Sequence, residues 1–183
     1  MLTYCTATTL DGFIADPDDS LDWLLRQKGG DSGSFDFDTF LAGVGATVMG
    51  STTYEWVTGH LHGTVEAWPY AVPSWVMTRR SLPAVHGADI RFASGDVRPV
   101  FEAMTAAAGG KALWVVGGGD LAGQFAEAGL LDEVVVSIAP VTLGAGRPLL
   151  PRRLDLELAG TAANGAFVCA RYRVAGPLLE DRS

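Results

Sequence analysis

The sequence has few cysteines and fewer basic than acidic residues, and each shortage narrows the kind of protein it encodes. Its two cysteines, Cys5 and Cys169, lie in apolar, strand-like stretches without a CxxC pair. They are therefore expected to be free core thiols rather than a disulfide scaffold. Thirteen basic residues face 21 acidic ones, for a net charge of −8. Because such a surface neutralises nucleic-acid phosphates poorly, we predict no nucleic-acid partner.

The sequence also lacks long hydrophobic runs. No apolar stretch reaches the length of a membrane span, and the chain begins with a strand-like pattern rather than a basic segment and a long apolar one. We therefore expect no membrane partner. The free thiols favour the reducing cytoplasm as the location.

Metal-binding patterns in the sequence are weak. His60 and His62 lie near Glu66, but no further ligand cluster accompanies them, so we predict no metal site. Three aspartates, Asp19 among them, crowd residues 16–19. This segment does not match the calcium-binding loop, so we interpret it as a solvated acidic loop.

Hydrophobic residues are abundant, at 48% of 183 residues, which is enough for one domain with a sizeable core. We expect residues 1–183 to form that single domain. Apolar patterns predict strands at 2–9, 47–49, 74–78, 90–93, 112–116, 133–139, 154–162 and 166–174. Because single helical patterns separate most of them, the sequence predicts an α/β fold with a mostly parallel central sheet flanked by helices.

Local signals refine this fold. One helix is predicted where apolar residues share a face, at Phe37, Phe40, Leu41 and Val44. A second apolar stripe predicts a helix over 97–108, with Asp96 as its N-cap. Asn164 and Gly165 lie between two strand patterns, which predicts an antiparallel hairpin at the C-terminus.

A glycine turn is the most informative segment of the chain. Four apolar residues lead into Gly117, Gly118 and Gly119, and a helical pattern starts at Leu121. Such a turn allows a phosphate or a ligand to approach main-chain N–H groups at a helix N-terminus. It can equally be a plain tight connection between a strand and a helix.

Two other strand ends carry chemistry that suits phosphate. Gly50 precedes Ser51, Thr52 and Thr53 at a helix start, where Thr52 and Glu55 have capping-box spacing. Thr78, Arg79 and Arg80 follow another buried strand. Arginines there suit a ribose 2′-phosphate, although a solvated turn is the alternative. Together, the three strand ends indicate a dinucleotide at the sheet edge, and the arginines favour NADPH over NADH.

At these residues the chain resembles the dihydrofolate-reductase-like superfamily, and within it the RibD C-terminal domain of riboflavin biosynthesis and its stand-alone relatives. The matching segments are TLDGFIA (9–15), LDWL (21–24), MGSTTYE (49–55), VMTR (76–79), VGGG (116–119) and IAPVTLGAG (138–146). The chain departs from the family at Ser51, where an arginine is common, and at Phe13, where the riboflavin enzymes often have a basic residue. From the sequence we expect no deaminase domain before the reductase-like part.

The resemblance implies a role for each matching position. The backbone of Ala7 and Ile14 holds the nicotinamide carboxamide, and the helix start from Gly50 to Thr53 takes the pyrophosphate. Thr78 and Arg79 surround the 2′-phosphate, with help from Arg80. The glycine turn, continued by Asp120 and Leu121, lies under the nicotinamide half. The loop that contains Pro140, Leu143 and Gly144 lies near the substrate.

The resemblance further implies an NADPH-dependent reductase that transfers hydride to a small heterocyclic substrate, like 5-amino-6-(5-phosphoribosylamino)uracil reductase. The alternatives are a dihydrofolate or pterin reductase, or a cofactor-binding protein without catalytic activity. Reduction also needs a proton, for which Asp11 and Asp22 are candidates if burial keeps one of them protonated. The sequence does not choose between them, and Asp36 and Asp38 are further possibilities.

Two aspects of organisation remain predictions. Trp56, Trp68, Tyr70 and Trp75 form either a ring-stacking surface or part of the core or a dimer contact. A long C-terminal hairpin leaves an apolar edge that is usually paired or covered. Together with the apolar loop 140–150, and because many relatives dimerise here, this predicts a homodimer.

Overall fold

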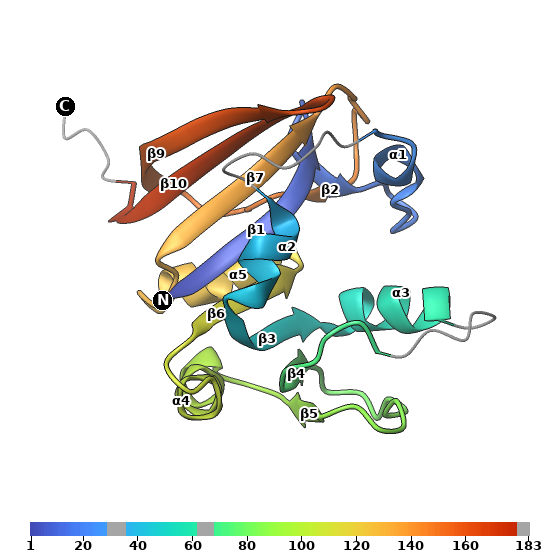
Figure 1. The fold of residues 1–183 in the computed structure, drawn as a ribbon, viewed down its shortest axis with the longest axis vertical. Helices are drawn as coiled ribbons and strands as arrows, with labels where there is room; N and C mark the ends of the chain where they lie inside the picture. The colour runs from blue at the N-terminus through green and yellow to red at the C-terminus, as the bar shows by residue number, and fades with distance from the viewer. Residues whose placement is uncertain (29–35, 62–67, 179–183) are drawn as a thin grey trace.

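The computed structural model describes residues 1–28, 36–61 and 68–178, and these build one eight-stranded sheet (Figure 1). The strand order is β5-β4-β3-β6-β1-β7-β10-β9. The strands are β1 (Leu2–Thr9), β3 (Val44–Gly50), β4 (Ser74–Met77), β5 (Ile90–Ala93), β6 (Ala112–Gly117), β7 (Glu133–Ala139), β9 (Leu154–Asn164) and β10 (Phe167–Pro177). Strands from β5 to β7 in this order are parallel, and β10 pairs antiparallel with both β7 and β9. The predicted α/β class and the C-terminal hairpin are confirmed.

Helices cover both faces of the sheet. The helices α4 (Val97–Ala107) and α5 (Gly119–Glu127) pack on one face, where Met104 and Phe125 are fully buried in the main core. On the other face lie α2 (Phe37–Ala42) and α3 (Ser51–Leu61). Tyr54 of α3 packs on Met49 and Val76 there, while α2 places Phe37 and Phe40 against the Trp114 ring.

In β3 and in β6, adjacent residues point to opposite faces of the sheet and enter different hydrophobic clusters. Val48 and Val115 point into the core beneath α4 and α5, whereas the next residues along, Met49 and Val116, belong to the cluster around Tyr54. Both faces of these strands are therefore apolar, as expected for parallel strands buried on both sides.

A short two-stranded sheet joins the segment after β1 to the segment before β9. Here β2 (Phe13–Ala15) pairs antiparallel with β8 (Arg147–Pro148), and Leu149 N–H donates to the Gly12 carbonyl at 2.9 Å. A four-residue helix, α1 (Asp22–Leu25), follows β2. None of these three elements is predictable from the sequence pattern, because each is too short to show a period of its own.

The predicted first helix is wrong at its C-terminal end. Helix α2 ends at Ala42, with Gly43 as its C-cap, and Val44 begins β3 as a buried residue. The predicted N-cap Asp96 is confirmed, because its carboxylate accepts from Arg98 N–H. Asp36, which was not predicted as a cap, accepts from the N–H groups of Asp38 and Thr39 at the start of α2.

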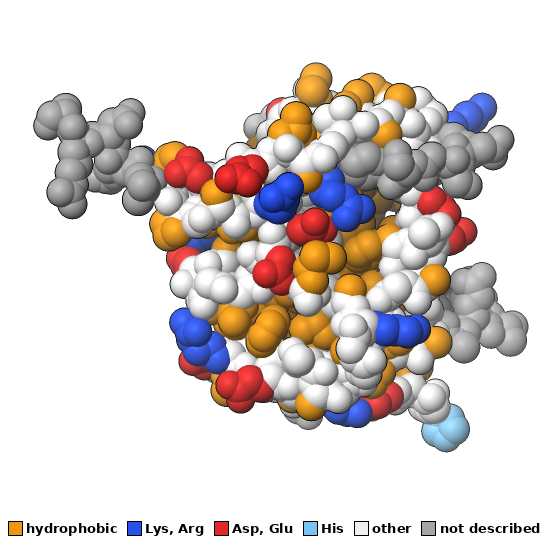
Figure 2. All heavy atoms as spheres, turned by 60° about the vertical axis from the view of Figure 1, so that its left-hand side comes forward, with side chains coloured by type: hydrophobic (Ala, Val, Ile, Leu, Met, Phe, Trp, Pro, Cys, Tyr) orange, Lys and Arg blue, Asp and Glu red, His pale blue; other side chains and the backbone are white. Residues whose placement is uncertain are grey.

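Charged side chains are mixed over the surface. Figure 2 shows one face on which acidic and basic side chains alternate with exposed hydrophobic ones, without a broad basic area. None of the helices in the described ranges is long and apolar enough to cross a membrane.

Candidate active site

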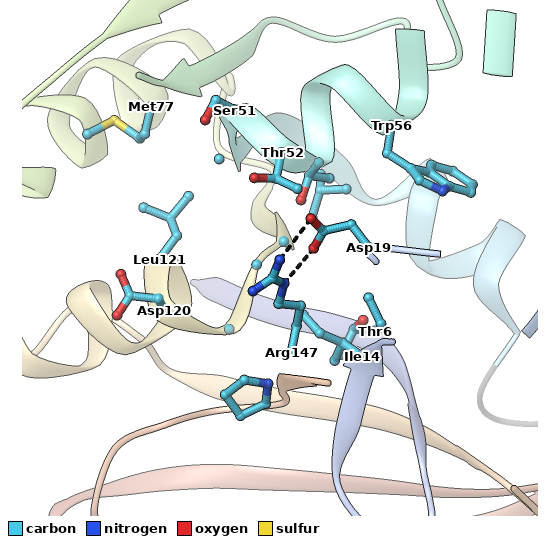
Figure 3. Close-up of a pocket in the computed structure, with 18 of the residues that line it drawn as sticks. Thr6, Ile14, Asp19, Ser51, Thr52, Trp56, Met77, Asp120, Leu121 and Arg147 are labelled. Atoms are coloured by element: carbon cyan, nitrogen blue, oxygen red, sulfur yellow. Dashed lines mark hydrogen bonds and ion pairs between the residues drawn. The ribbon is translucent and has the colours of Figure 1, made fainter. Parts of the chain in front are cut away.

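A cavity of about 590 Å³ opens where the parallel strands end (Figure 3). Its walls include the last residues of β3, β4 and β6, the first residues of α3 and α5, and the loop around β8. The lining residues are Thr6, Ile14, Ala15, Asp19, Leu21, Gly50, Ser51, Thr52, Thr53, Trp56, Met77, Val116, Gly117, Gly118, Gly119, Asp120, Leu121, Gln124, Arg147, Pro148 and Pro151. Ligands of open α/β sheets bind at this carboxyl edge.

The start of α3 forms one wall of the pocket. Gly50 ends β3 and the helix begins at Ser51, so the first N–H groups of α3 have no partner within the helix. Thr53 packs against the end of β6, because a Cβ atom on Gly117 would lie only 3.0 Å from Thr53 Oγ1. The predicted Thr52–Glu55 capping box is wrong: Thr52 lies inside the first turn, and the Glu55 carboxylate binds Arg80 instead.

The glycine turn forms the opposite wall, and its glycines serve different purposes. The Gly117–Gly118 peptide bond is cis, and Gly118 is the N-cap of α5. A Cβ atom on Gly118 would point toward the pocket and contact only Ile14 Cδ1, at 3.8 Å. One on Gly119 would overlap the carbonyl oxygens of Pro148 and Leu149. Gly118 thus faces ligand space, whereas Gly119 allows the β8 loop to pack against α5.

Asp120, in the first turn of α5, has a carboxylate that is engaged in hydrogen bonds. Its carboxylate accepts from Gln124 Nε2 and Arg152 Nη2, each at 2.9 Å. These hydrogen bonds, first from Gln124 and then from Arg152, lower the pKa of Asp120. The side chain is consequently an anion at neutral pH.

Asp19 and Arg147 both line the pocket and bind one another there (Figure 3). Arg147 Nε donates to Asp19 Oδ1 at 2.6 Å and Nη2 donates to Oδ2 at 3.0 Å. The hydrogen bonds from Arg147 lower the pKa of Asp19. The interpretation of residues 16–19 as a solvated acidic loop fits the exposed Asp18, but Asp19 is in addition paired with Arg147. The Asp19–Arg147 ion pair depends on the pairing of β2 with β8, and no local sequence pattern predicts it.

The four predicted aromatics divide between core and pocket. Trp75 is buried in the main core, and Trp68 and Tyr70 pack beside Tyr54. Only Trp56, on α3, lines the cavity. His62 and Glu66 lie outside the described residues. The described ranges contain no cluster of metal-ligating side chains.

Asp11 is not the buried carboxyl we expected. It is exposed and does not line the cavity. Its carboxylate accepts from Thr9 Oγ1 at 2.6 Å, from Leu143 N–H at 3.0 Å and from Gly144 N–H at 2.7 Å. The Thr9 hydrogen bond, followed by that from Gly144, lowers the pKa of Asp11. Asp11 therefore anchors the loop that contains Leu143 and Gly144.

The other predicted acids also lie away from the cavity wall. Asp22 is exposed in α1, although its neighbour Leu21 lines the pocket. Asp36 caps α2, and its hydrogen bond from Thr39 lowers its pKa. Asp38 is exposed in the first turn of α2. The expectation of a buried, protonated carboxyl is thus wrong for Asp11, and none of the other three is buried.

Several predicted binding residues lie outside the cavity wall. Ala7 is half-buried in β1 opposite Ser137, and Pro140, Leu143 and Gly144 belong to the neighbouring loop. Beyond β4, Met77 lines the cavity, but Thr78, Arg79 and Arg80 do not. Arg80 binds Glu55 through both guanidinium Nη atoms. The structure brings together the α3 start, the glycine turn and Ile14, and leaves the arginines at the rim of β4.

Comparison of the sequence with known proteins identifies the family to which the chain belongs. The sequence model described as the RibD C-terminal domain matches residues 1–169. YwjB, an uncharacterised protein of Bacillus subtilis (strain 168), is 31% identical over 170 residues, which cover 91% of this chain and 93% of YwjB.

Two solved structures place the fold. A protein of Shewanella sp. PV-4, described as a riboflavin biosynthesis protein, is 25% identical with a TM-score of 0.78, covering 94% of this chain and 98% of that one. Dihydrofolate reductase from Enterococcus faecalis, solved with NADP(H), is 13% identical with a TM-score of 0.55, and 96% of each chain is covered. This second likeness concerns the fold alone, and it confirms the dihydrofolate-reductase-like architecture.

Proposed function

Because the chain belongs to the RibD C-terminal domain family, we propose that it is an NADPH-dependent reductase of a small heterocyclic substrate. The observation that carries this proposal is the meeting of α3, α5 and the glycine turn in one cavity at the carboxyl edge of the sheet. Two helix N-termini offer unpartnered N–H groups and positive dipole ends to the same space.

The residues present fit a dinucleotide. The N–H groups at Ser51, Thr52 and Thr53 would bind the pyrophosphate, and the bare Gly118 would leave room for the nicotinamide ring beside Ile14. The cofactor supplies the hydride when bound, and the protein supplies position and electrostatics. Trp56 offers an aromatic face to a planar substrate in the same pocket.

The choice between NADPH and NADH rests on Arg79 in this proposal. Arg79 is exposed just after β4, beside the start of the pocket at Met77. Arg80 already binds Glu55, so it contributes less than the sequence suggested. Ser51, where relatives often have arginine, leaves Arg79 as the residue we propose for the 2′-phosphate.

The source of the proton follows from the charges in the pocket. Both carboxyls among the described lining residues, Asp19 and Asp120, have lowered pKa values and are anions at neutral pH. Neither is suited to act as a general acid there. We therefore propose that water entering the open cavity protonates the substrate, with Asp22 as the acid to test by substitution.

Two measurements test the function. Binding of NADPH is followed by quenching of tryptophan fluorescence, and turnover by loss of reduced-nicotinamide absorbance with uracil-type, dihydrofolate and other pterin substrates. Binding with turnover of one class supports a reductase and names that class. Binding without turnover of any would favour a cofactor-binding protein, and absence of NADPH binding would overturn the proposal.

A further inference from the structure

Arg147 is the only basic side chain among the described residues that line the cavity. It is also engaged by a carboxylate of the same cavity, because two of its nitrogens donate to the two oxygens of Asp19. Figure 3 shows the two side chains pointing toward one another among the lining residues. The geometry is the forked arrangement with which a guanidinium also binds phosphate.

The Asp19 carboxylate is presented to Arg147 by a preformed turn. Asp16 Oδ1 accepts from the N–H groups of Asp18 and Ser20, at 2.9 and 2.8 Å, and Asp19 lies between them with a φ of 63°. Arg147 is placed by the pairing of β8 with β2, opposite Ala15. Backbone structure on both sides therefore brings the two charges together before any ligand binds.

This ion pair is easily opened. The Arg147 side chain is 55% exposed and that of Asp19 is 36% exposed. Ion pairs open to water contribute little net stability, so exchanging one partner for another anion costs little. The other lining carboxylate, that of Asp120, already has Arg152 and Gln124 as partners and does not compete for Arg147.

We propose that Arg147 binds a phosphate group of the pocket's ligand and that Asp19 competes for the same guanidinium until the ligand arrives. This inference rests on the proposed function and adds the ligand group that Arg147 recognises, a phosphate. The phosphate belongs either to the dinucleotide or to a sugar-phosphate substrate. On binding, the phosphate takes over the two donors and the Asp19 side chain turns toward water.

The test is a set of variants with opposite expected effects, measured by tryptophan-fluorescence titration. Asp19→Asn removes the competitor and tightens phosphate binding by about three- to tenfold. Arg147→Gln weakens it by at least about tenfold, the scale of a charge-assisted hydrogen bond. The double variant binds like Arg147→Gln, because without the guanidinium there is nothing to compete for.

Two further variants control for charge and folding. Glu102→Gln removes one carboxylate charge from an exposed position of α4, outside the cavity wall, and leaves the affinity within about twofold. Arg147→Lys keeps the charge without the fork and gives an intermediate affinity. It keeps the test decisive if Arg147→Gln unfolds, and thermal unfolding of each ligand-free variant shows which of them are folded.

Three titrations distinguish the source of the phosphate. Opposite shifts with NADPH alone assign Arg147 to the cofactor. Unchanged NADPH affinity, with opposite shifts for ribose 5-phosphate added to the NADPH-bound protein, assigns it to the substrate. If the wild type binds no dinucleotide, the proposed function fails, and titration with inorganic pyrophosphate decides this inference by the same criterion. Affinities that stay unchanged, or that fall in both single variants, would overturn it and leave the ion pair a purely structural link between two loops.

Discussion

At the scale of single residues, Gly118 and Gly119 of the turn lack a side chain for different structural reasons. Gly118 has open pocket in front of it, whereas Gly119 is pressed against the main chain of the β8 loop. A sequence cannot distinguish them, since both are glycines in the same run, and the difference arises from a loop about 30 residues further along.

We expect Gly118→Val to abolish NADPH binding in a protein that still folds, because its methyl groups would occupy the cavity beside Ile14. Gly119→Ala should instead lower the free energy of unfolding by about 1–3 kcal/mol, since no side chain can yield to the added methyl. Fluorescence titration and urea unfolding of both variants check this. Normal NADPH affinity in Gly118→Val would remove the turn from the cofactor site.

Arg79 gives a second prediction at this scale. Arg79→Ala should weaken NADPH binding by about 1.5–3 kcal/mol and leave NADH binding nearly unchanged, since only NADPH carries the 2′-phosphate. Arg80→Ala is the matched control, because Arg80 already binds Glu55 and should affect NADPH less. Parallel titrations with both cofactors measure the difference. Equal losses for NADH and NADPH would mean that Arg79 is structural.

At the scale of elements, the helices and strands with a regular apolar spacing were predicted from the sequence. The short strands that form only by pairing with a distant segment were not. The long strands and the helices α4 and α5 follow from apolar spacing and from caps such as Asp96. The strands β2 and β8 have three and two residues and exist only through their mutual pairing. For this reason the glycine turn and the α3 start of the site were predictable, but Arg147 and Asp19 were not.

Asp11 links the loop after β1 to the loop that contains Leu143 and Gly144, and its contribution to stability should depend on pH. Because its pKa is lowered in the folded protein, its stabilising contribution is present above the ordinary aspartate pKa and is lost as the pH falls below about 4. Asp11→Asn should therefore have a lower melting temperature than wild type at pH 7, with the gap closing in strong acid. Thermal scans from pH 7 to pH 2 check this, with Asp18→Asn as a control for net charge. A gap independent of pH would contradict the assigned role.

At the scale of the whole molecule, the exposed edge of the sheet predicts an assembly. The edge strand β9 exposes Leu156 by 40% and Leu158 by 62%, and its neighbour β10 exposes Val168 by 57%. An unprotected apolar edge of this length is a surface on which another chain can pair or pack. We propose that two copies associate here around a two-fold axis.

Light scattering at micromolar concentration should give twice the monomer mass of 19.2 kDa. Leu158→Lys should shift the population to monomer, because it places a charge in the apolar contact. Phe92→Lys is the matched control: Phe92 is 40% exposed, but it lies in β5, at the opposite edge of the sheet from β9. A wild-type monomer, or equal effects of the two lysines, would rule out this interface.

The contact of Gly119 with the β8 loop is repeated at the far side of the same loop. A Cβ atom on Gly146 would overlap the Ala15 carbonyl, so this loop meets both neighbours main chain against main chain. Backbone has no rotamers to adjust, and a change on one side cannot be offset by trimming a side chain on the other. The loop therefore offers evolution, and the protein engineer, few places to vary. Altered ligand preference should arise mainly where side chains border the cavity, at Asp19, Trp56 and Arg147.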